Sequence, residues 1–515
     1  MPALVESSTV RSARQAAAPQ PADHATAVVG ADLKVPLVNG EWVGYANFDY
    51  AASAPALEAV REAVEAALPW YASVHRGAGF ASQVSTRVYG RARAVVAGFL
   101  GCRADDAVIF TRNTTDGLNL LARALPDGCT VVVFDAEHHA NLLPWDAAAR
   151  TVRLPLPDSP RAAVEAAADA LRSAPAGPRL LCVTGASNVT GELWPVQELT
   201  EVAHAYGARI AVDAAQLVPH RRVDLAGTGI DYLAFSGHKL YAPFGAGVLA
   251  GRADWLAAAD PYLHGGGATR SVTRTAPSAG GAGASHAAGV GATPAAGAGA
   301  IPAAEAGATP AAGADATLAA EVEAGALPAA EAGAGGRLGV EWAADPEARH
   351  EAGSPNVLGA VAIAAACTAL QRDFAELRAA EGRLLRSLRE GLATVPGLRE
   401  LRLFGPDAAR VGIVAFTLDG WEAGRLAAVL SAEYGIGVRD GLFCAHPLTR
   451  GLLPEGTGAA VRASLGAGTR PEHVARLVSA LRRLATTAPD WDYAVIDGRW
   501  TPIPDPRPNP ATTAI

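Results

Sequence analysis

The sequence predicts an α/β fold in which a mainly parallel sheet is flanked by helices, followed by a smaller C-terminal α+β domain. Five short, continuous apolar runs are typical of strands buried on both faces of a parallel sheet. They lie at 107–110, 130–134, 179–183, 209–212 and 232–235. Amphipathic helical patterns separate several of these runs, for example at 88–100 and 196–206. Alternating strands and helices of this kind predict a layered α/β domain.

The 515 residues divide into six parts by composition and periodicity. Residues 1–32 are rich in Ala, Ser and Pro without periodicity, which predicts a disordered tail. The other parts are a large domain (33–270), an Ala/Gly/Pro-rich insertion (271–337), the remainder of the large domain with a connecting helix (338–385), a small domain (386–488) and an irregular tail (489–515). Helix formers dominate 356–398, and the small domain shows a strand pattern at 411–417 and a helix pattern at 472–485.

The insertion repeats Gly-Ala-Thr-Pro-Ala-Ala-Gly-Ala at 291–298 and 307–314, and residues 276–336 contain no Lys or Arg. A repeat can indicate a solenoid, but a stacked solenoid core needs large apolar side chains that this repeat lacks. A flexible surface insertion is therefore the favoured interpretation.

Charge and apolar patterning favour an enzyme that acts on a small molecule. The net charge of −8 offers no basic stripe of the kind that nucleic-acid binding requires. No apolar run reaches about 18 residues, and no basic segment leads into an apolar stretch at the start, so we expect no membrane association and a cytoplasmic location. The five cysteines are irregularly spaced, which is typical of neither a disulfide framework nor a zinc site.

Lys239 is the first candidate for chemistry, because only two of the 43 cationic Lys and Arg residues are Lys. A guanidinium cannot replace an amine that must lose its proton. Lys239 closes the motif Ser236-Gly-His-Lys directly after the run at 232–235, and α/β sheets bind ligands at the carboxyl ends of their strands. Asp213 ends the preceding run. A carboxylate there forms either an ordinary ion pair or the partner of a protonated pyridine nitrogen in a pyridoxal 5′-phosphate (PLP) site.

Polar residues at the start of a helix suggest a phosphate site. Thr114 and Thr115 follow the run at 107–110 and open a helical pattern. Such residues serve either as a helix N-cap or as a phosphate seat that uses free backbone N–H groups. In the second case Ser236 and His238 would add donors from the other side.

Two further strand ends carry candidates for contacts to a cofactor ring. His138 and His139 follow the run at 130–134. Adjacent histidines do not converge on an ion as residues four apart do, so we predict no metal site and favour His138 as a ring that stacks on a flat cofactor. Asn188 follows the run at 179–183 and would hydrogen-bond a phenolic oxygen together with Gln216.

In their order along the chain, the motifs resemble class V aminotransferase-type enzymes of PLP fold type I, most closely the cysteine desulfurase/selenocysteine lyase branch. The resemblance covers roughly residues 45–270 and 338–488. The matching motifs are Phe48-Asp-Tyr-Ala-Ala-Ser-Ala-Pro, His75-Arg-Gly-Ala-Gly, Thr111-Arg-Asn-Thr-Thr-Asp, Glu137-His-His-Ala-Asn, Asp213-Ala-Ala-Gln, Ser236-Gly-His-Lys, Glu351-Ala-Gly-Ser-Pro-Asn, Val438-Arg-Asp-Gly-Leu-Phe-Cys and Val461-Arg-Ala-Ser-Leu. The resemblance implies a large PLP-binding domain with a seven-stranded sheet, and a homodimer with active sites at its interface.

The resemblance also implies roles for single residues. Lys239 would form the Schiff base with PLP, Asp213 would partner the pyridine nitrogen, and His138 would stack on the ring as part of the catalytic set. Arg462 and Ser53 would bind the amino-acid substrate, with Arg462 receiving its carboxylate through two parallel hydrogen bonds. The remaining implied contacts, to the ring hydroxyl and the phosphate, are Gln216, Asn188, Thr114, Thr115, Ser236 and His238.

Cys444 decides which reaction is expected. In cysteine desulfurases a loop cysteine at this place takes the sulfur of PLP-bound cysteine, leaving alanine and an enzyme persulfide, and its thiolate must be accessible. The resemblance therefore implies cysteine desulfuration, with a sulfur-acceptor protein as a candidate partner. Leu442 and Phe443 stand where relatives often carry histidine, so an aminotransferase, epimerase or C–S lyase acting on another amino acid stays open as the alternative. A scaffold without turnover is disfavoured by the intact Lys239 motif.

Overall fold

The computed structural model describes residues 26–75, 77–274 and 338–509, which divide into two compact units. The second unit spans 270–341. Its described part is a two-stranded sheet of β11 (Thr269–Arg274) and β12 (Leu338–Trp342). Across this sheet Arg270 Nη1 and Glu341 Oε1 form an ion pair at 3.1 Å. The repeats predicted to form a surface insertion, and residues 1–25 of the predicted tail, lie outside the described residues.

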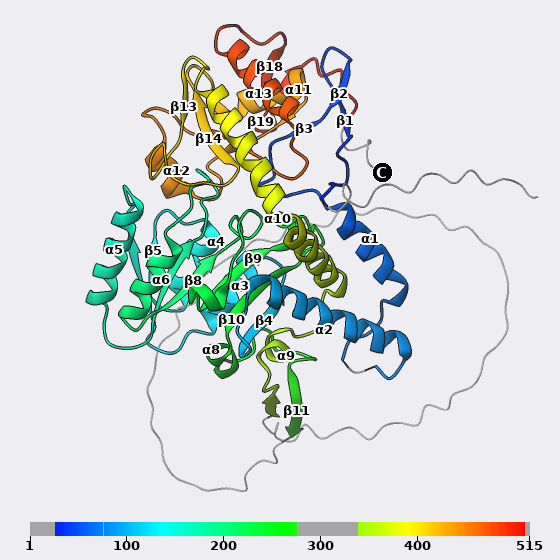
Figure 1. The fold of residues 1–515 in the computed structure, drawn as a ribbon, viewed down its shortest axis with the longest axis vertical. Helices are drawn as coiled ribbons and strands as arrows, with labels where there is room; N and C mark the ends of the chain where they lie inside the picture. Colours follow the sequence, from blue (N-terminus) through cyan, green and yellow to red (C-terminus); the bar gives the residue numbers. More distant parts are fainter. Residues whose placement is uncertain (1–25, 76, 275–337, 510–515) are drawn as a thin grey trace, which may run out of the picture. The chain divides into compact units, whose positions relative to one another are not determined.

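The first unit contains a seven-stranded mixed sheet, which confirms the predicted fold class (Figure 1). Its strands, in spatial order, are β4 (Asp106–Thr111), β10 (Gly247–Arg252), β9 (Tyr232–Ser236), β8 (Arg209–Asp213), β7 (Arg179–Thr184), β5 (Thr130–Phe134) and β6 (Arg150–Leu154). Within this sheet β10 runs antiparallel to both of its neighbours, and the other described pairings are parallel.

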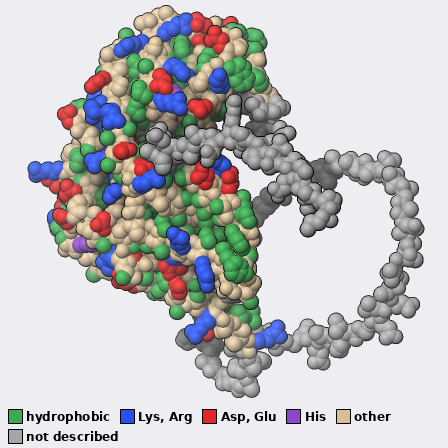
Figure 2. All heavy atoms as spheres, turned by 45° about the vertical axis from the view of Figure 1, so that its right-hand side comes forward, with side chains coloured by type: hydrophobic (Ala, Val, Ile, Leu, Met, Phe, Trp, Pro, Cys, Tyr) green, Lys and Arg blue, Asp and Glu red, His purple; other side chains and the backbone are tan. Residues whose placement is uncertain are grey.

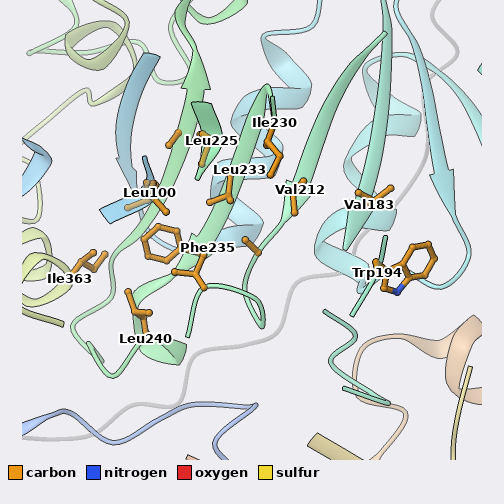
Figure 3. Close-up of a cluster of buried hydrophobic side chains, with 14 of the residues drawn as sticks. Leu100, Val183, Trp194, Val212, Leu225, Ile230, Leu233, Phe235, Leu240 and Ile363 are labelled. Atoms are coloured by element: carbon orange, nitrogen blue, oxygen red, sulfur yellow. The ribbon is translucent and has the colours of Figure 1, made fainter. Parts of the chain in front are cut away.

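Alternate residues of the strands pack into two different hydrophobic clusters, so both faces of the sheet are buried. In β9, Leu233 and Phe235 join one cluster (Figure 3), whereas Tyr232 and Ala234 join the other. The helices that contribute to the first cluster are α1 (Glu58–Ala67), α2 (Phe80–Leu100), α5 (Pro160–Ser173), α6 (Val196–Ala205), α7 (Leu225–Thr228), α10 (Val357–Leu392) and α12 (His446–Leu452). Those of the second are α3 (Thr114–Arg123), α4 (His139–Leu142) and α8 (Ala253–Ala258). A short helix, α9 (Pro346–His350), lies beside β4.

The helix α10 confirms the helical pattern at 356–398 and connects the two sheets of the first unit. It packs against α1 and α2 beside the large sheet and continues to α13 (Pro471–Leu484) beside the small one (Figure 1). By length and composition alone it could span a membrane, but 67% of its most apolar window is buried inside the protein. Its apolar character is that of a core helix.

A four-stranded antiparallel sheet forms the second core. Its strands, in spatial order, are β13 (Leu398–Glu400), β14 (Ile413–Leu418), β17 (Ala460–Ser464) and β16 (Arg439–Gly441). The helices α11 (Ala423–Tyr434) and α13 contribute buried side chains to this core. The N-terminal strands β1 (Lys34–Pro36) and β2 (Trp42–Gly44) pair with each other, and β3 (Ala46–Asn47) pairs with β15 (Ile436–Gly437). The predictions of a strand at 411–417 and a helix at 472–485 are confirmed by β14 and α13.

Both terminal predictions are wrong in part. Within the tail predicted at 1–32, Val28 is buried and forms a bridge with Leu57 of the core. Within the irregular tail predicted at 489–515, β18 (Asp492–Ile496) and β19 (Arg499–Ile503) form a hairpin. Asp497 and Gly498 turn the chain with φ angles of 50° and 74°, a geometry that favours Asp-Gly.

Gly237 is needed where the chain leaves β9 for Lys239, because a Cβ there would lie 2.7 Å from the Ala246 carbonyl oxygen. Gly237→Ala is therefore expected to lower the free energy of unfolding by about 1–3 kcal/mol, measured by chemical denaturation. Gly90→Ala is the matched control: its Cβ would meet nothing within 4 Å in the middle of α2, so the free energy of unfolding should stay equal or rise. Equal losses in the two variants would contradict this account.

Candidate active site

A cavity of about 560 Å³ lies at the carboxyl ends of the central strands, where the sequence predicts ligand binding. Ten predicted site residues line it, and these are Thr114, Thr115, His138, Asn188, Asp213, Ser236, His238, Lys239, Cys444 and Arg462. Gln216 and Ser53 are not among the lining residues. The Gln216 amide donates to the Ala51 carbonyl oxygen at 2.6 Å, and the Ser53 hydroxyl donates to the His238 carbonyl oxygen at 3.4 Å. Their implied roles stay predictions.

At the cavity Asp213 is buried and Lys239 is partly buried, and the charge of each shifts the pKa of the other. Burial lowers the pKa of Lys239 below its usual value, while the Asp213 carboxylate acts in the opposite direction. Burial raises the pKa of Asp213, against the effect of Lys239 and of the Ala215 N–H, which donates to Oδ1 at 2.9 Å. A buried amine of this kind loses its proton more readily than an exposed lysine and can act as a nucleophile.

The N-terminus of α3 forms a hydroxyl-lined cradle. Asn113 is the N-cap, since its Oδ1 accepts from the Asp116 N–H at 2.9 Å. The capping alternative for Thr114 and Thr115 is thereby settled in favour of Asn113. The Thr114 hydroxyl instead lies 2.7 Å from the Ser236 hydroxyl, which also accepts from the Thr114 N–H at 2.8 Å. Hydroxyl groups at a helix N-terminus suit an anion such as phosphate.

His138 presents a neutral ring to the cavity. Its Nδ1 accepts from the Ala140 N–H at 3.0 Å, which caps α4. Burial lowers its pKa to about 3, with smaller contributions from the positive charges of Lys239 and Arg462 and from His139. In the part of the chain that the structure describes, no group of three or more His, Cys, Asp or Glu side chains is arranged to hold a metal ion.

Glu137, directly before His138, is fully buried behind the site. Its two carboxyl oxygens accept from the Asn141 side-chain amide and the Thr184 N–H, each at 2.8 Å. Burial raises the pKa of Glu137 from the usual 4.5 to about 8, and the nearby Asp213 carboxylate adds to the increase. Two neighbouring carboxyl groups do not both ionise easily in a buried site, and here Glu137 is the one that stays neutral.

This raised pKa predicts a pH-dependent stability. Folding favours the protonated form of Glu137, so its contribution to the free energy of unfolding is complete below pH 4.5 and is lost as the pH rises towards 8. Chemical denaturation of the wild type and of Glu137→Gln, repeated at pH values between 4.5 and 8, should show that the wild type loses stability relative to the variant as the pH rises. For one proton, the difference in free energy of unfolding between the two proteins changes by at most about 1.4 kcal/mol per pH unit. If the difference in free energy of unfolding between the two proteins does not change with pH, Glu137 is ionised in the folded protein.

Arg462 is buried beside Lys239 and has an incomplete set of partners. Nη1 donates to the Asn188 carbonyl oxygen at 2.9 Å, Nη2 lies 3.4 Å from Asp49 Oδ1, and Nε has no hydrogen-bond partner among the described residues. Burial lowers its pKa to about 10, so the guanidinium stays charged at neutral pH. Arg462 lines the cavity, so its charged guanidinium can attract a carboxylate there.

Sequence reasoning missed two charged residues here. Arg439 lines the cavity and stands directly opposite Arg462 in the β16–β17 pair. Two like charges in this position repel each other, and Asp49 lies between them, with Oδ2 only 2.8 Å from Arg439. The β-strand register brings these residues together. The signal available in the sequence was the Val438-Arg-Asp-Gly motif, which places Arg439 just before the cysteine loop.

Cys444 is exposed at the cavity, unlike the buried Cys129, Cys182 and Cys367. Both Phe443 and Cys444 have left-handed backbone conformations, with φ angles of 53° and 54°. Such angles cost about 1–2 kcal/mol in residues other than Gly, so surrounding contacts must hold this loop.

Comparisons with known proteins agree with this geometry. The family model for class-V aminotransferases matches residues 46–305 and 335–477. A cysteine desulfurase from Dickeya dadantii (strain 3937) is 33% identical over 463 residues, which cover 87% of this chain and 93% of that protein. A second cysteine desulfurase, from Klebsiella pneumoniae (strain 342), is 33% identical over 462 residues and covers 87% and 94%.

Solved structures give the same result. An apo cysteine desulfurase from Thermococcus onnurineus NA1 superposes with a TM-score of 0.66 at 27% identity, covering 86% of this chain and 94% of that one. The Escherichia coli cysteine desulfurase CsdA, with an S-sulfonic acid group, gives a TM-score of 0.63 at 29% identity, covering 85% and 94%. Together with the match along most of the sequence, these likenesses show that the chain belongs to the class-V aminotransferase family.

Proposed function

We propose that this protein is a PLP-dependent cysteine desulfurase, which converts L-cysteine to alanine and leaves the sulfur as a persulfide on Cys444. The observation that carries the proposal is one exposed thiol on the wall of a cavity that is also lined by Lys239 and the buried Arg462. The relatives named above, which are cysteine desulfurases, support the same reaction.

The residues of the cavity fit PLP. The hydroxyls of Thr114, Thr115 and Ser236 at the start of α3 suit its phosphate. The Asp213 carboxyl suits the pyridine nitrogen, the Lys239 amine suits the aldehyde, and the Asn188 side chain suits the ring hydroxyl. When bound, PLP supplies an electron sink that weakens the bonds at the α-carbon of an amino acid.

The chain's own groups then divide the remaining work. Arg462 receives the substrate carboxylate with its guanidinium, and Arg439 adds a second positive charge at the cavity. Lys239 is the group that moves protons at the substrate carbon, since burial favours its neutral form. Cys444 Sγ takes the substrate sulfur: an S–S bond forms while the C–S bond breaks, and the carbon receives a proton.

A product assay tests the reaction. The PLP-loaded enzyme is incubated with L-cysteine and a thiol reductant, and alanine, sulfide and keto acid are measured in the same samples. Equal amounts of alanine and sulfide are expected. Sulfide with keto acid but without alanine would indicate a C–S lyase, and neither sulfide nor alanine would rule out desulfuration.

The homodimer is also a proposal, and an apolar surface supports it. Hydrophobic side chains gather on the face that carries α1 and α2 (Figure 2). In this region Leu68, Trp70, Tyr71 and Phe80 are exposed, and the exposed fraction of Phe80 reaches 70%. Large exposed apolar patches are typical of interaction sites. Light scattering after size exclusion should give twice the chain mass, and a paired Trp70→Glu, Phe80→Glu variant should shift it towards one chain.

We further propose a cytoplasmic location and a sulfur-acceptor protein as partner. The persulfide on Cys444 must be released for a second turnover, and an exposed thiol can be reached by another protein. A small thiol reductant can replace that partner in the assay. Mixing the persulfide form with a candidate acceptor and following the persulfide mass on each chain tests this step.

A further inference from the structure

We propose that Phe443 is a positioning residue that couples the charge of Arg462 to the position of Cys444. This inference rests on the desulfurase function proposed above and deepens it. It assigns a role to the side chain next to the thiol, and it explains why a loop with two left-handed residues carries the thiol.

The first observation is a buried cation–π contact. The Arg462 guanidinium lies over the Phe443 ring, 5.1 Å from its centre. Phe443 is 8% exposed and Arg462 3%, so water and salt screen this attraction little. The side chain next to the thiol is thus held by the residue that receives the substrate carboxylate.

The second observation is the backbone of the same loop. Phe443 and Cys444 have φ angles of 53° and 54°, which disfavour residues with a Cβ. Two hydrogen bonds and the ring contact hold this conformation: the Asn188 amide donates to the Phe443 carbonyl oxygen at 2.8 Å, and the His139 N–H donates to the Cys444 carbonyl oxygen at 2.7 Å. Weakening any one of them favours relaxation of the loop.

These contacts connect substrate binding to the thiol. A carboxylate that binds at Arg462 in the cavity neutralises the guanidinium, which weakens its attraction to the Phe443 ring. The strain in the loop then favours release of Phe443 and Cys444. The thiol is therefore restrained while the site lacks substrate and becomes free to move when the carboxylate arrives.

The test measures how fast iodoacetamide alkylates Cys444 in the PLP-loaded full chain, with and without L-alanine. The Cys444 peptide is read by mass spectrometry, which separates it from the other four cysteines. L-Alanine brings the carboxylate without a sulfur atom, and the visible absorbance of the cofactor reports its binding. In the wild type we expect bound L-alanine to accelerate alkylation about two- to fivefold.

Three variants locate the effect. Phe443→Ala should react fast both with and without L-alanine, because the restraint is gone. Phe443→Tyr keeps the ring and should restore the response to L-alanine. Leu442→Ala is the matched control, since it shortens the neighbouring side chain but leaves the ring on Arg462, and it should respond like the wild type.

The proposal is overturned if bound L-alanine leaves the wild-type rate unchanged, or if Phe443→Ala shows the same acceleration as the wild type. Neither result depends on sulfur transfer. Failure of the proposed function is seen separately, as missing alanine and sulfide from L-cysteine.

Discussion

Replacing Lys239 with Arg is expected to abolish turnover, with kcat lowered by about 10³-fold or more. The amine lies partly buried at the cavity, and this burial lowers its pKa, so a neutral nucleophile is available. A guanidinium keeps its charge and cannot take over either covalent attachment of the cofactor or proton transfer. Steady-state kinetics with L-cysteine measure the loss.

A second readout shows where the cofactor is attached. Borohydride reduction of the PLP-loaded wild type should add the cofactor mass to the Lys239 peptide, and Lys239→Arg should show no such adduct. Lys34→Arg is the matched control, because Lys34 is the other lysine of the chain and is exposed on β1. Cofactor mass on Lys34, or full activity of Lys239→Arg, would contradict the assignment.

The sequence could predict the central strands because they are buried on both faces. A strand such as β9 reads as a continuous apolar run, since each of its faces packs into a different cluster. The sequence patterns did not predict two strands of the large sheet, β6 and β10, for different reasons. β6 lies at the sheet edge, and its apolar residues are interrupted by the charged Arg150 and Arg153, while β10 begins and nearly ends with glycine.

Within the site, local motifs were predictable and long-range neighbours were not. Thr114, His138 and Lys239 each follow a strand, so their place at one edge of the sheet follows from the fold class. Arg439 and Asp49 meet Arg462 only through the register of β16 with β17 and the path of the N-terminal segment. Gln216 follows Asp213 closely in the sequence, but its amide is bound to the Ala51 carbonyl oxygen, so its implied contact to the cofactor ring stays a prediction.

Replacing Cys444 with Ala is expected to stop alanine and sulfide formation, with kcat lowered by about 10²-fold or more, while the cofactor stays bound. The thiol lies on the cavity wall, and the residues proposed to hold PLP come from other elements, so cofactor binding does not need it. An exposed side chain contributes little packing, and the free energy of unfolding should change by less than about 0.5 kcal/mol. Product assays and the visible absorbance of the cofactor measure the two effects.

Cys102→Ser is the matched control, because burial raises the pKa of the Cys102 thiol to about 12 and leaves little thiolate for chemistry. It should keep full activity.

The comparison of Cys444→Ala with the wild type also separates the two reaction classes that the sequence left open. Transamination, epimerisation and C–S lysis by elimination need Lys239 but no thiol, so a Cys444→Ala variant that still converts its amino acid at the wild-type rate would assign the enzyme to one of those reactions. Loss of turnover confined to Cys444→Ala would instead require sulfur to pass through this thiol.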